Sequence, residues 1–373
     1  MTTEKMTYRW LWSCLIAGGL LLLTGCTDNF EEVQQPSPVP EPQPEEGDML
    51  ELRAVTRTSG AYQIPTTENP ATSVQLFLYT LSPTNENPNH YTAVNGMFSY
   101  SGNYWSSSSA ITVKEETQYY LYGYMPSSVT GSVSADDLND DYSKGVDLTL
   151  SNLPAITTDD IGVLVGVQRV GSTTTEAPNV KEGQYGFRSG IKGENFLNLL
   201  MAHLYARVKL SFKIDPAYAE LRSIDLKDVK LTTAFGPVKA VVNLRDKQGI
   251  GTPTFTTGTT QETVTLYTRS NTHDKVLSKD SLQLALNIPA YCTPLNSTSG
   301  TYNLTLRTEY DVSDRGSDGH RRHLGERTSV NTIKLSAALL LPGKERNITL
   351  TVKPTYLYIL SDNDLDNPTI IIN

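Results

Sequence analysis

The chain has 373 residues, and a prior of roughly 150 residues per domain predicts two domains. Lysine and arginine number 31 against 40 aspartates and glutamates, which gives the chain a net charge of −9. No basic stretch is long enough to follow a phosphate backbone, so nucleic acid is excluded as a partner. Hydrophobic residues make up 38%, which is enough for a packed core and excludes general disorder.

The first 25 residues have the pattern of a lipoprotein signal. Lys5 and Arg9 precede an apolar run over residues 10–23, which is too short to span a bilayer comfortably and long enough for the core of a signal peptide. The run ends at Leu23-Thr24-Gly25-Cys26, which resembles a bacterial lipobox. We predict a signal peptide over 1–25 and lipidation of the Cys26 thiol, which places the protein at the outer membrane. The alternative is an ordinary signal peptide with an incidental cysteine.

Residues 26–48 are predicted to form a tether. An acidic segment over residues 27–32 is similar to the acidic tethers of surface-exported lipoproteins in the Bacteroidales, although a merely solvated tether remains the alternative. Five prolines then alternate with other residues between positions 36 and 44. Such a run favours the polyproline II conformation, which acts as a semi-rigid spacer between the membrane and the body.

The body from Met49 onward reads as a series of strands separated by turn residues. Tyrosine outnumbers phenylalanine by 20 to 8, a balance typical of half-exposed strands. The first half contains expected strands at 73–81, 117–125, 161–168 and 196–214, the last of them entering a second domain. The second half contains expected strands at 223–232, 238–244, 263–268, 282–289, 302–310, 328–335, 347–354 and 369–372. We predict an all-β protein with two tandem β-sandwiches, over 49–207 and 208–373.

The sequence lacks the common catalytic motifs, so we expect no enzyme activity and no cofactor. His320 and His323 are close in sequence, but the surrounding arginines would repel a cation, which favours a solvated hairpin tip within 311–327 over a metal site. Cys292 is the only cysteine of the body and has no paired base in sequence, so it is expected to be a small buried residue. Asp280-Ser281-Leu282 resembles an O-glycosylation acceptor of the Bacteroidales, which makes Ser281 a candidate modification site.

Several segments together resemble the fimbrillin superfamily of the Bacteroidales, the lipoprotein-derived type V pilins. They are the lipobox and the stretches 120–126, 203–208, 341–352 and 354–360, which span most of the chain. His203, within the second stretch, is expected to be a satisfied core histidine. The resemblance implies transthyretin-like sandwiches and a non-enzymatic structural subunit. It further implies a precursor whose N-terminal strand is removed by a trypsin-like protease and replaced by a strand of another subunit.

The residues that such processing needs are present near the start of the body. The segment 49–55 alternates like a strand and contains the bond between Arg53 and Ala54, and the bond between Arg57 and Thr58 follows. Arg53-Ala54 is favoured, because a cut within or beside the strand releases Cys26 and the spacer together. That cut removes three basic and nine acidic residues and leaves a net charge of −3, which eases self-association.

The C-terminal residues 368–373 are apolar and β-branched, and Thr369, Ile370, Ile371 and Ile372 are predicted to form the donated strand. The alternative is that they form the final strand of their own sandwich. Tip and anchor subunits share this fold, so an uncleaved tip adhesin or glycan-binding surface lipoprotein is the alternative function. Tyr100, Tyr104 and Trp105 would then supply an aromatic platform on a surface hairpin.

The resemblance also implies the partners and the location. The expected partners are other fimbrial subunits, the outer membrane through the lipid, a trypsin-like protease and a host or bacterial surface receptor. The expected location is the outer surface of the cell and, after processing, the fimbrium. A surface glycosidase would need two carboxylates facing each other across a cleft, and no local pattern indicates such a pair.

Overall fold

The computed structural model divides the chain into two units, Met1–Pro44 and Glu45–Asn373. The residues that it describes are 47–57, 73–81, 91–101, 104–134, 146–175, 178–236, 238–245, 249–271, 273–297, 299–315, 321–356 and 363–372. All of them belong to the second unit. The predicted signal peptide, Cys26 and most of the predicted tether lie outside the described residues.

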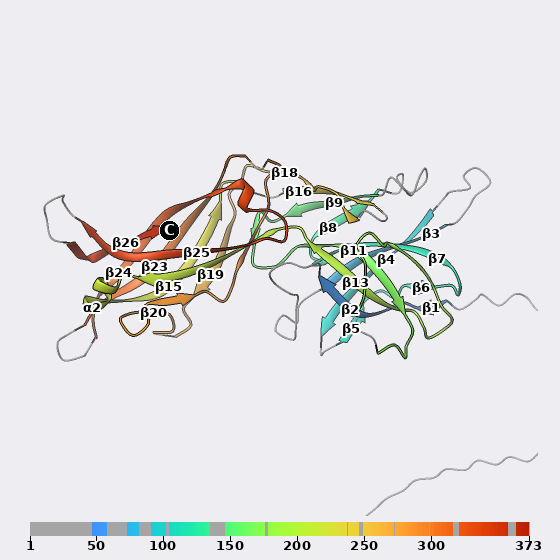
Figure 1. Ribbon diagram of the computed structural model, residues 1–373, viewed down its shortest axis with the longest axis horizontal. Coiled ribbons are helices and arrows are strands. Elements are labelled where there is room, and N and C mark those ends of the chain that lie inside the picture. Colours follow the sequence, from blue (N-terminus) through green and yellow to red (C-terminus); the bar gives the residue numbers. More distant parts are fainter. Residues whose placement is uncertain are drawn as a thin grey trace, which may run out of the picture. The chain divides into compact units, whose positions relative to one another are not determined.

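Strands predominate among the described residues of the second unit and helix is nearly absent from them, which confirms the all-β prediction. Its largest sheet, sheet I, has eight strands and lies at the blue-to-green end of the chain in Figure 1. Its order is β2 (Glu51–Arg57), β13 (Phe196–His203), β11 (Gly162–Val170), β7 (Gln118–Met125), β3 (Ser73–Leu81), β4 (Tyr91–Ser101) and β5 (Tyr104–Ser107), with β12 (Gly186–Arg188) paired to β7. The two ends of this order, β2 and β5, contact each other, so the sheet curls toward closure.

The central strands of sheet I are buried on both faces, and neighbouring residues of a strand point to opposite faces. Leu76 and Leu78 belong to one cluster of buried side chains, and Phe77 and Tyr79 belong to another. The first, which we call the inner cluster, comprises Leu50, Leu52, Val74, Leu76, Leu78, Phe98, Ile111, Val113, Tyr119, Leu121, Met125, Leu164, Val167, Phe187, Leu197, Leu199 and Met201. A short pairing of β1 (Asp48–Met49) with β6 (Thr112–Val113) lies beside it.

The opposite face of sheet I packs against sheet II, and their shared cluster contains side chains from both. Sheet II has the order β17 (Gly249–Ile250), β16 (Val238–Arg245), β9 (Val146–Leu153) and β8 (Thr130–Val133), with β18 (Thr254–Thr257) paired to β16. β16 pairs antiparallel with β9, with Val242 opposite Leu148. The boundary expected at residue 207 therefore does not describe sheet II, whose strands come from both sides of it.

Two further sheets share another cluster of buried side chains. Sheet III has the order β10 (Ile156–Thr157), β22 (Ala290–Cys292), β14 (Ala206–Ile214), β25 (Glu345–Tyr356) and β26 (Asn363–Ile372), with β21 (Gln283–Ala285) paired to β14. Sheet IV has the order β19 (Thr263–Thr268), β15 (Arg222–Thr233), β23 (Thr301–Arg315) and β24 (Arg321–Ser336), with β20 (Val276–Leu277) paired to β15. The short helix α2 (Pro216–Leu221) begins at the N-cap Asp215, and the 3₁₀ turn η2 covers Ala337–Leu339.

Two expectations about strands need correction. The segment 196–214 is not one strand: β13 ends at His203, β14 begins at Ala206, and the two belong to different sheets. The chain passes from sheet I to sheet III between these two strands. There the hydroxyl of Tyr205 donates a hydrogen bond to the Pro154 carbonyl at 2.6 Å. The charged segment 311–327 is not a long hairpin tip either, because β23 continues to Arg315 and β24 starts at Arg321.

Candidate site at the N-terminal strand

Among the described residues, the strand β2 has a single hydrogen-bonded neighbour in sheet I. It pairs with β13 in parallel, whereas the other pairings of this sheet are antiparallel. Glu51 lies opposite Phe196, and Leu52 lies opposite Leu197. A strand with one neighbour leaves the sheet by breaking one ladder of hydrogen bonds, whereas a central strand has two to break.

The apolar side of β2 and of the residue before it fills the inner cluster. Leu50 is 1% exposed and Leu52 is 7% exposed, and Val55 packs against the same cluster while partly exposed. Burial of a leucine side chain stabilises a fold by about 1.5–3 kcal/mol. Loss of this segment would therefore open the sheet edge and expose apolar side chains of the inner cluster together.

Arg53 occupies an irregular position of the strand. The register moves from Leu52 opposite Leu197 to Ala54 opposite Asn198, so Arg53 is the extra residue of a β-bulge. A bulge takes its extra residue out of the regular ladder and bends the strand. The Arg53 side chain is exposed, and its Nη1 atom lies 3.4 Å from the Gly171 carbonyl oxygen. Arg57 ends β2, and Thr58 lies outside the described residues.

The C-terminal segment lies at the end of sheet III. β26 pairs antiparallel with β25, with Ile370 opposite Val352, Ile371 opposite Thr351 and Thr369 opposite Lys353. In this chain the segment therefore pairs within its own sheet, as in the alternative that the sequence left open. Donation to another subunit stays a prediction.

The three aromatic residues of the alternative site lie on the hairpin of β4 and β5. Tyr100 and Trp105 are cross-strand partners whose ring centroids are 5.3 Å apart with planes inclined at 52°. Tyr104 is 65% exposed, whereas Trp105 packs against the inner cluster while partly exposed. The Tyr100 and Trp105 rings are thus adjacent, whereas Tyr104 precedes Trp105 on β5 and points to the opposite face, so the three rings do not form one platform.

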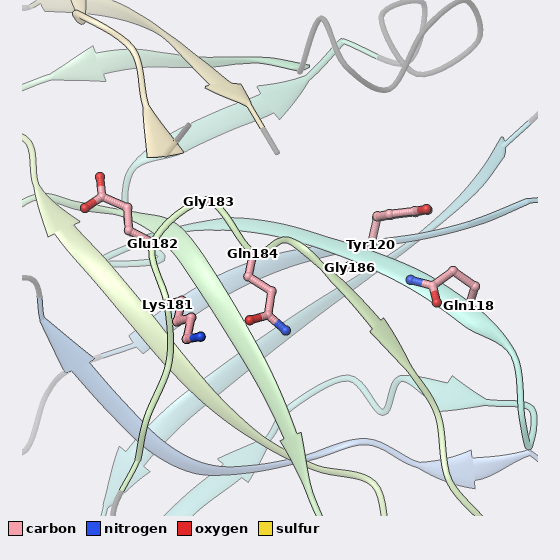
Figure 2. Close-up of a pocket in the computed structure, with 7 residues that line it drawn as sticks. All are labelled: Gln118, Tyr120, Lys181, Glu182, Gly183, Gln184 and Gly186. Atoms are coloured by element: carbon pink, nitrogen blue, oxygen red, sulfur yellow. The ribbon is translucent and has the colours of Figure 1, made fainter. Parts of the chain in front are cut away.

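A pocket of about 600 Å³ lies between β7 and the loop before β12 (Figure 2). Its lining residues are Gln118, Tyr120, Lys181, Glu182, Gly183, Gln184 and Gly186. The loop turns at Gly183, where φ is 82°. In Figure 2 the Lys181 and Glu182 side chains point away from one another, so their charged groups do not converge on one place in the pocket.

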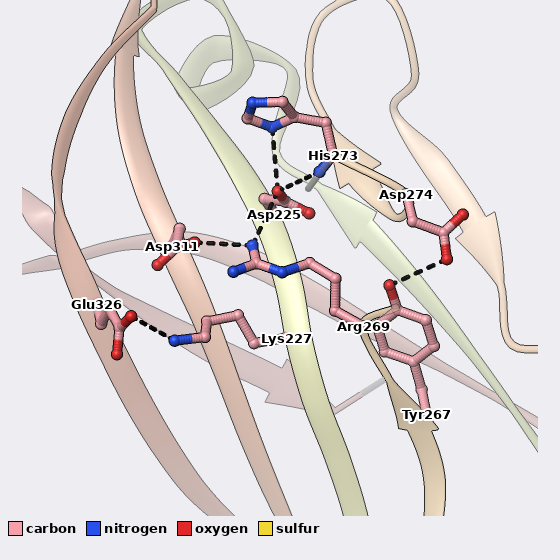
Figure 3. A network of polar contacts seen from close by, with 8 residues as sticks. All are labelled: Asp225, Lys227, Tyr267, Arg269, His273, Asp274, Asp311 and Glu326. Atoms are coloured by element: carbon pink, nitrogen blue, oxygen red, sulfur yellow. Dashed lines mark hydrogen bonds and ion pairs between the residues drawn. The ribbon is translucent and has the colours of Figure 1, made fainter. Parts of the chain in front are cut away.

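Sheet IV carries a polar network that the sequence analysis missed (Figure 3). Asp225, Asp311 and Glu326 are successive register partners on β15, β23 and β24. Arg269 Nη1 lies 3.0 Å from Asp225 Oδ2 and 2.8 Å from Asp311 Oδ2, and Lys227 pairs with Glu326. Each acid of the row thus has a cationic partner, which favours a structural role. These three acids come together only through the pairing of their strands, so no sequence motif indicates them.

The histidine and cysteine expectations can be compared with the structure directly. His203 is buried, and its Nδ1 atom lies 2.8 Å from Asp160 Oδ2, so it is a core histidine with a carboxylate partner. Cys292 is fully buried, and burial raises the pKa of its thiol to about 12, so it is the inert residue that was expected. His323 is exposed on β24, and His320 lies outside the described residues. Within the described ranges, no group of three or more His, Cys, Asp or Glu residues is suited to hold a metal.

Ser281 lies on an exposed turn just before β21. Its backbone N–H donates to the Ser278 carbonyl at 3.0 Å, and the Ser278 N–H donates back to the Ser281 carbonyl at 2.9 Å. This double pairing presents the exposed Ser281 beside Leu282, which is 37% exposed. Modification of Ser281 stays a prediction.

Comparisons with known proteins give structural similarities at low sequence identity. No family model matches the chain, and no curated protein matches it. A fimbrial protein from Bacteroides vulgatus is similar with a TM-score of 0.37 and 13% identity, over 87% of this chain and 98% of that chain. A candidate cell adhesion protein from Bacteroides fragilis has a TM-score of 0.39 and 11% identity, over 87% and 97%. A fimbrial anchor protein from Porphyromonas gingivalis has a TM-score of 0.31 and 11% identity, over 88% and 97%.

Among the described residues, no helix has the length and apolar character that crossing a bilayer requires.

Proposed function

We propose that the chain is a structural subunit of a surface fimbria that supports adhesion. In this proposal it is exported as a precursor with its lipid on Cys26, cut after Arg53 and assembled by exchange of strands. The observation that carries it is the state of β2: one parallel neighbour, leucines that fill the inner cluster, and an exposed arginine at a bulge. Its location is the outer membrane surface before processing and the fimbrium afterwards.

Removal of the N-terminal strand creates a binding site for another strand. The edge of β13 would offer unpaired backbone groups, and the inner cluster would lose Leu50 and Leu52. An extended apolar segment fills such a site, because backbone hydrogen bonds give affinity and alternate side chains give register. In the segment 369–372, Ile370 and Ile372 have the two-residue spacing that Leu50 and Leu52 have. We assign these isoleucines to the two vacated positions.

The position of the cut decides how much of β2 leaves. A cut after Arg53 removes both buried leucines and leaves Ala54 and Val55 at the edge of the sheet. A cut after Arg57 removes the whole strand. Both cuts separate Cys26 from the body. Either would therefore free the subunit from its lipid anchor for assembly.

The test is limited digestion with trypsin of the full chain, purified in detergent from a host that processes lipoproteins. New N-termini are identified by mass, and size-exclusion chromatography then follows assembly over days. The proposal expects a cut confined to Arg53 or Arg57 and a ladder of oligomers that deletion of residues 369–373 abolishes. A chain that is cut and stays monomeric, or that oligomerises equally without residues 369–373, contradicts assembly by this strand.

A second candidate function is an uncleaved tip adhesin or glycan-binding surface lipoprotein. The observation in its favour is the exposed Tyr104 at the start of β5, on the hairpin that also carries the ring pair of Tyr100 and Trp105. Aromatic rings on an exposed hairpin offer apolar faces to a ligand. Resistance to trypsin at both arginines, together with glycan binding that Tyr104→Ala weakens, would favour this function over the first.

A further inference from the structure

The chain just before β2 is held by a charged side chain. Asp48 Oδ2 accepts hydrogen bonds from the Gly193 backbone N–H at 2.8 Å and from Asn195 Nδ2 at 2.7 Å. Burial raises the pKa of the Asp48 carboxyl, but these bonds, the Met49 N–H and the Lys192 ammonium outweigh that effect and leave the pKa below its ordinary value. Asp48 is therefore ionised at neutral pH, and both bonds are charge-assisted.

Asn195 is itself fixed within the body of the protein. It is 1% exposed, and its Oδ1 atom accepts a hydrogen bond from the Gly190 N–H at 2.8 Å. Its backbone carbonyl accepts the Glu51 N–H at 3.0 Å. One rigid residue ahead of β13 therefore binds both the Asp48 side chain and the first residue of β2.

The apolar contacts of the strand specify its register only in part. Leu50 and Leu52 are identical and two positions apart, so a slip by two residues would place Leu52 where Leu50 lies and keep the same face inward. The contact of Asp48 does not survive such a slip, because its donors are held in one place. It therefore selects the register in which Arg53 is the residue of the bulge.

We propose that the contact between Asp48 and Asn195 is a latch that positions β2 in register and retains it after the backbone has been cut. The role of this latch in assembly rests on the proposed function, since it is the departure of β2 that would open the site. Asp48 and Asn195 are positioning residues: they act through the placement of the strand. A latched strand leaves slowly, which delays association between subunits until an incoming strand competes for the site.

The latch can be tested without relying on a cut at Arg53. A recognition sequence for a specific endoprotease is inserted within residues 58–72 of the full chain, which is cut in detergent. Size-exclusion chromatography and intact mass then follow how fast the N-terminal fragment leaves the body. The variants are Asp48→Ala and Asp48→Asn, which keeps an acceptor oxygen. Glu51→Gln is the matched control, because it removes a charge from the exposed first residue of β2.

Loss of the charged acceptor is expected to speed departure of the fragment by about tenfold or more, because hydrogen bonds to charged groups are stronger than those between neutral groups. The departure rate of Asp48→Asn is expected to lie between the rates of Asp48→Ala and the wild type. The rate of Glu51→Gln is expected to stay within about twofold of the wild-type rate. In the uncut variants, trypsin is expected to favour Arg53 over Arg57 less than in the wild type. The melting temperature of the body without its fragment should be the same in all variants.

Departure from Asp48→Ala at the wild-type rate would overturn the latch. That result is distinguishable from failure of the proposed function, in which the wild type holds its fragment through Asp48 but never assembles once the fragment has left.

Discussion

Leu52 on β2 lies opposite Leu197 on β13, and the two buried side chains belong to the same cluster. They come from segments far apart in the sequence and meet through a parallel pairing at the end of sheet I. Since β2 has one neighbouring strand in the part of sheet I that the structure describes, its retention depends on these side chains more than that of a central strand would.

Leu52→Ala should therefore loosen β2 before the rest of the body. The expected loss is about 2–3 kcal/mol, because a large-to-small change in a packed cluster removes apolar contacts and leaves a cavity. Hydrogen exchange measured by mass spectrometry should show faster exchange of amides in β2 and β13. Leu81→Ala is the matched control, since Leu81 is 48% exposed, and its effect should stay within about 0.5 kcal/mol. Equal effects of the two substitutions would contradict the role given to Leu52.

Arg53→Gln should remove the main site of trypsin cleavage, because the exposed arginine at the bulge offers its backbone more readily than a residue within the regular ladder. Arg57→Gln is the comparison and should leave the main cut in place. Mass spectrometry of the new N-termini distinguishes the two variants. A main cut that is lost in Arg57→Gln and kept in Arg53→Gln would move the processing site to Arg57.

Departure of β2 should change the fluorescence of Trp105. Trp105 packs against the inner cluster on β5, a strand that contacts β2. It is the only tryptophan after Cys26, since the others are Trp10 and Trp12. Removal of the fragment should let water reach the ring and shift its emission to longer wavelength. Trp105→Phe should abolish the signal, and an emission spectrum that stays constant as the fragment leaves would contradict this packing.

Retention of the cut strand should depend on pH through Asp48. The folded-state pKa of Asp48 lies below its ordinary value of 3.8, so its stabilising effect is present above that value and is lost as the pH falls through the folded-state pKa. Lys192 is a cation near this carboxyl and contributes to the lowered pKa of Asp48. The departure rate of the fragment, measured between pH 7 and pH 3, should rise at the acidic end in the wild type. In Asp48→Asn this rise should be smaller, and an identical rise in both would contradict the assignment to Asp48.

The alternation of apolar and polar residues predicted most strands of the body, because a strand with buried faces carries its pattern locally. β3 was expected at 73–81 and covers Ser73–Leu81, and Cys292 and His203 are buried as expected. The sequence identified Arg53 as a candidate cleavage site but did not predict the bulge there, because the bulge depends on the register between β2 and β13.

By itself, then, the sequence determined that this is an all-β body behind a lipobox-like N-terminus, with strands whose positions follow from their own side chains. Only the tertiary structure decided which strands meet. β16 joins β9 in sheet II although it follows the expected boundary at 207, and Asp48 meets Asn195 across 147 positions of sequence. The physical reason is that a strand's hydrogen-bonding groups are alike along its length, so the choice of partner depends on packing over the whole body.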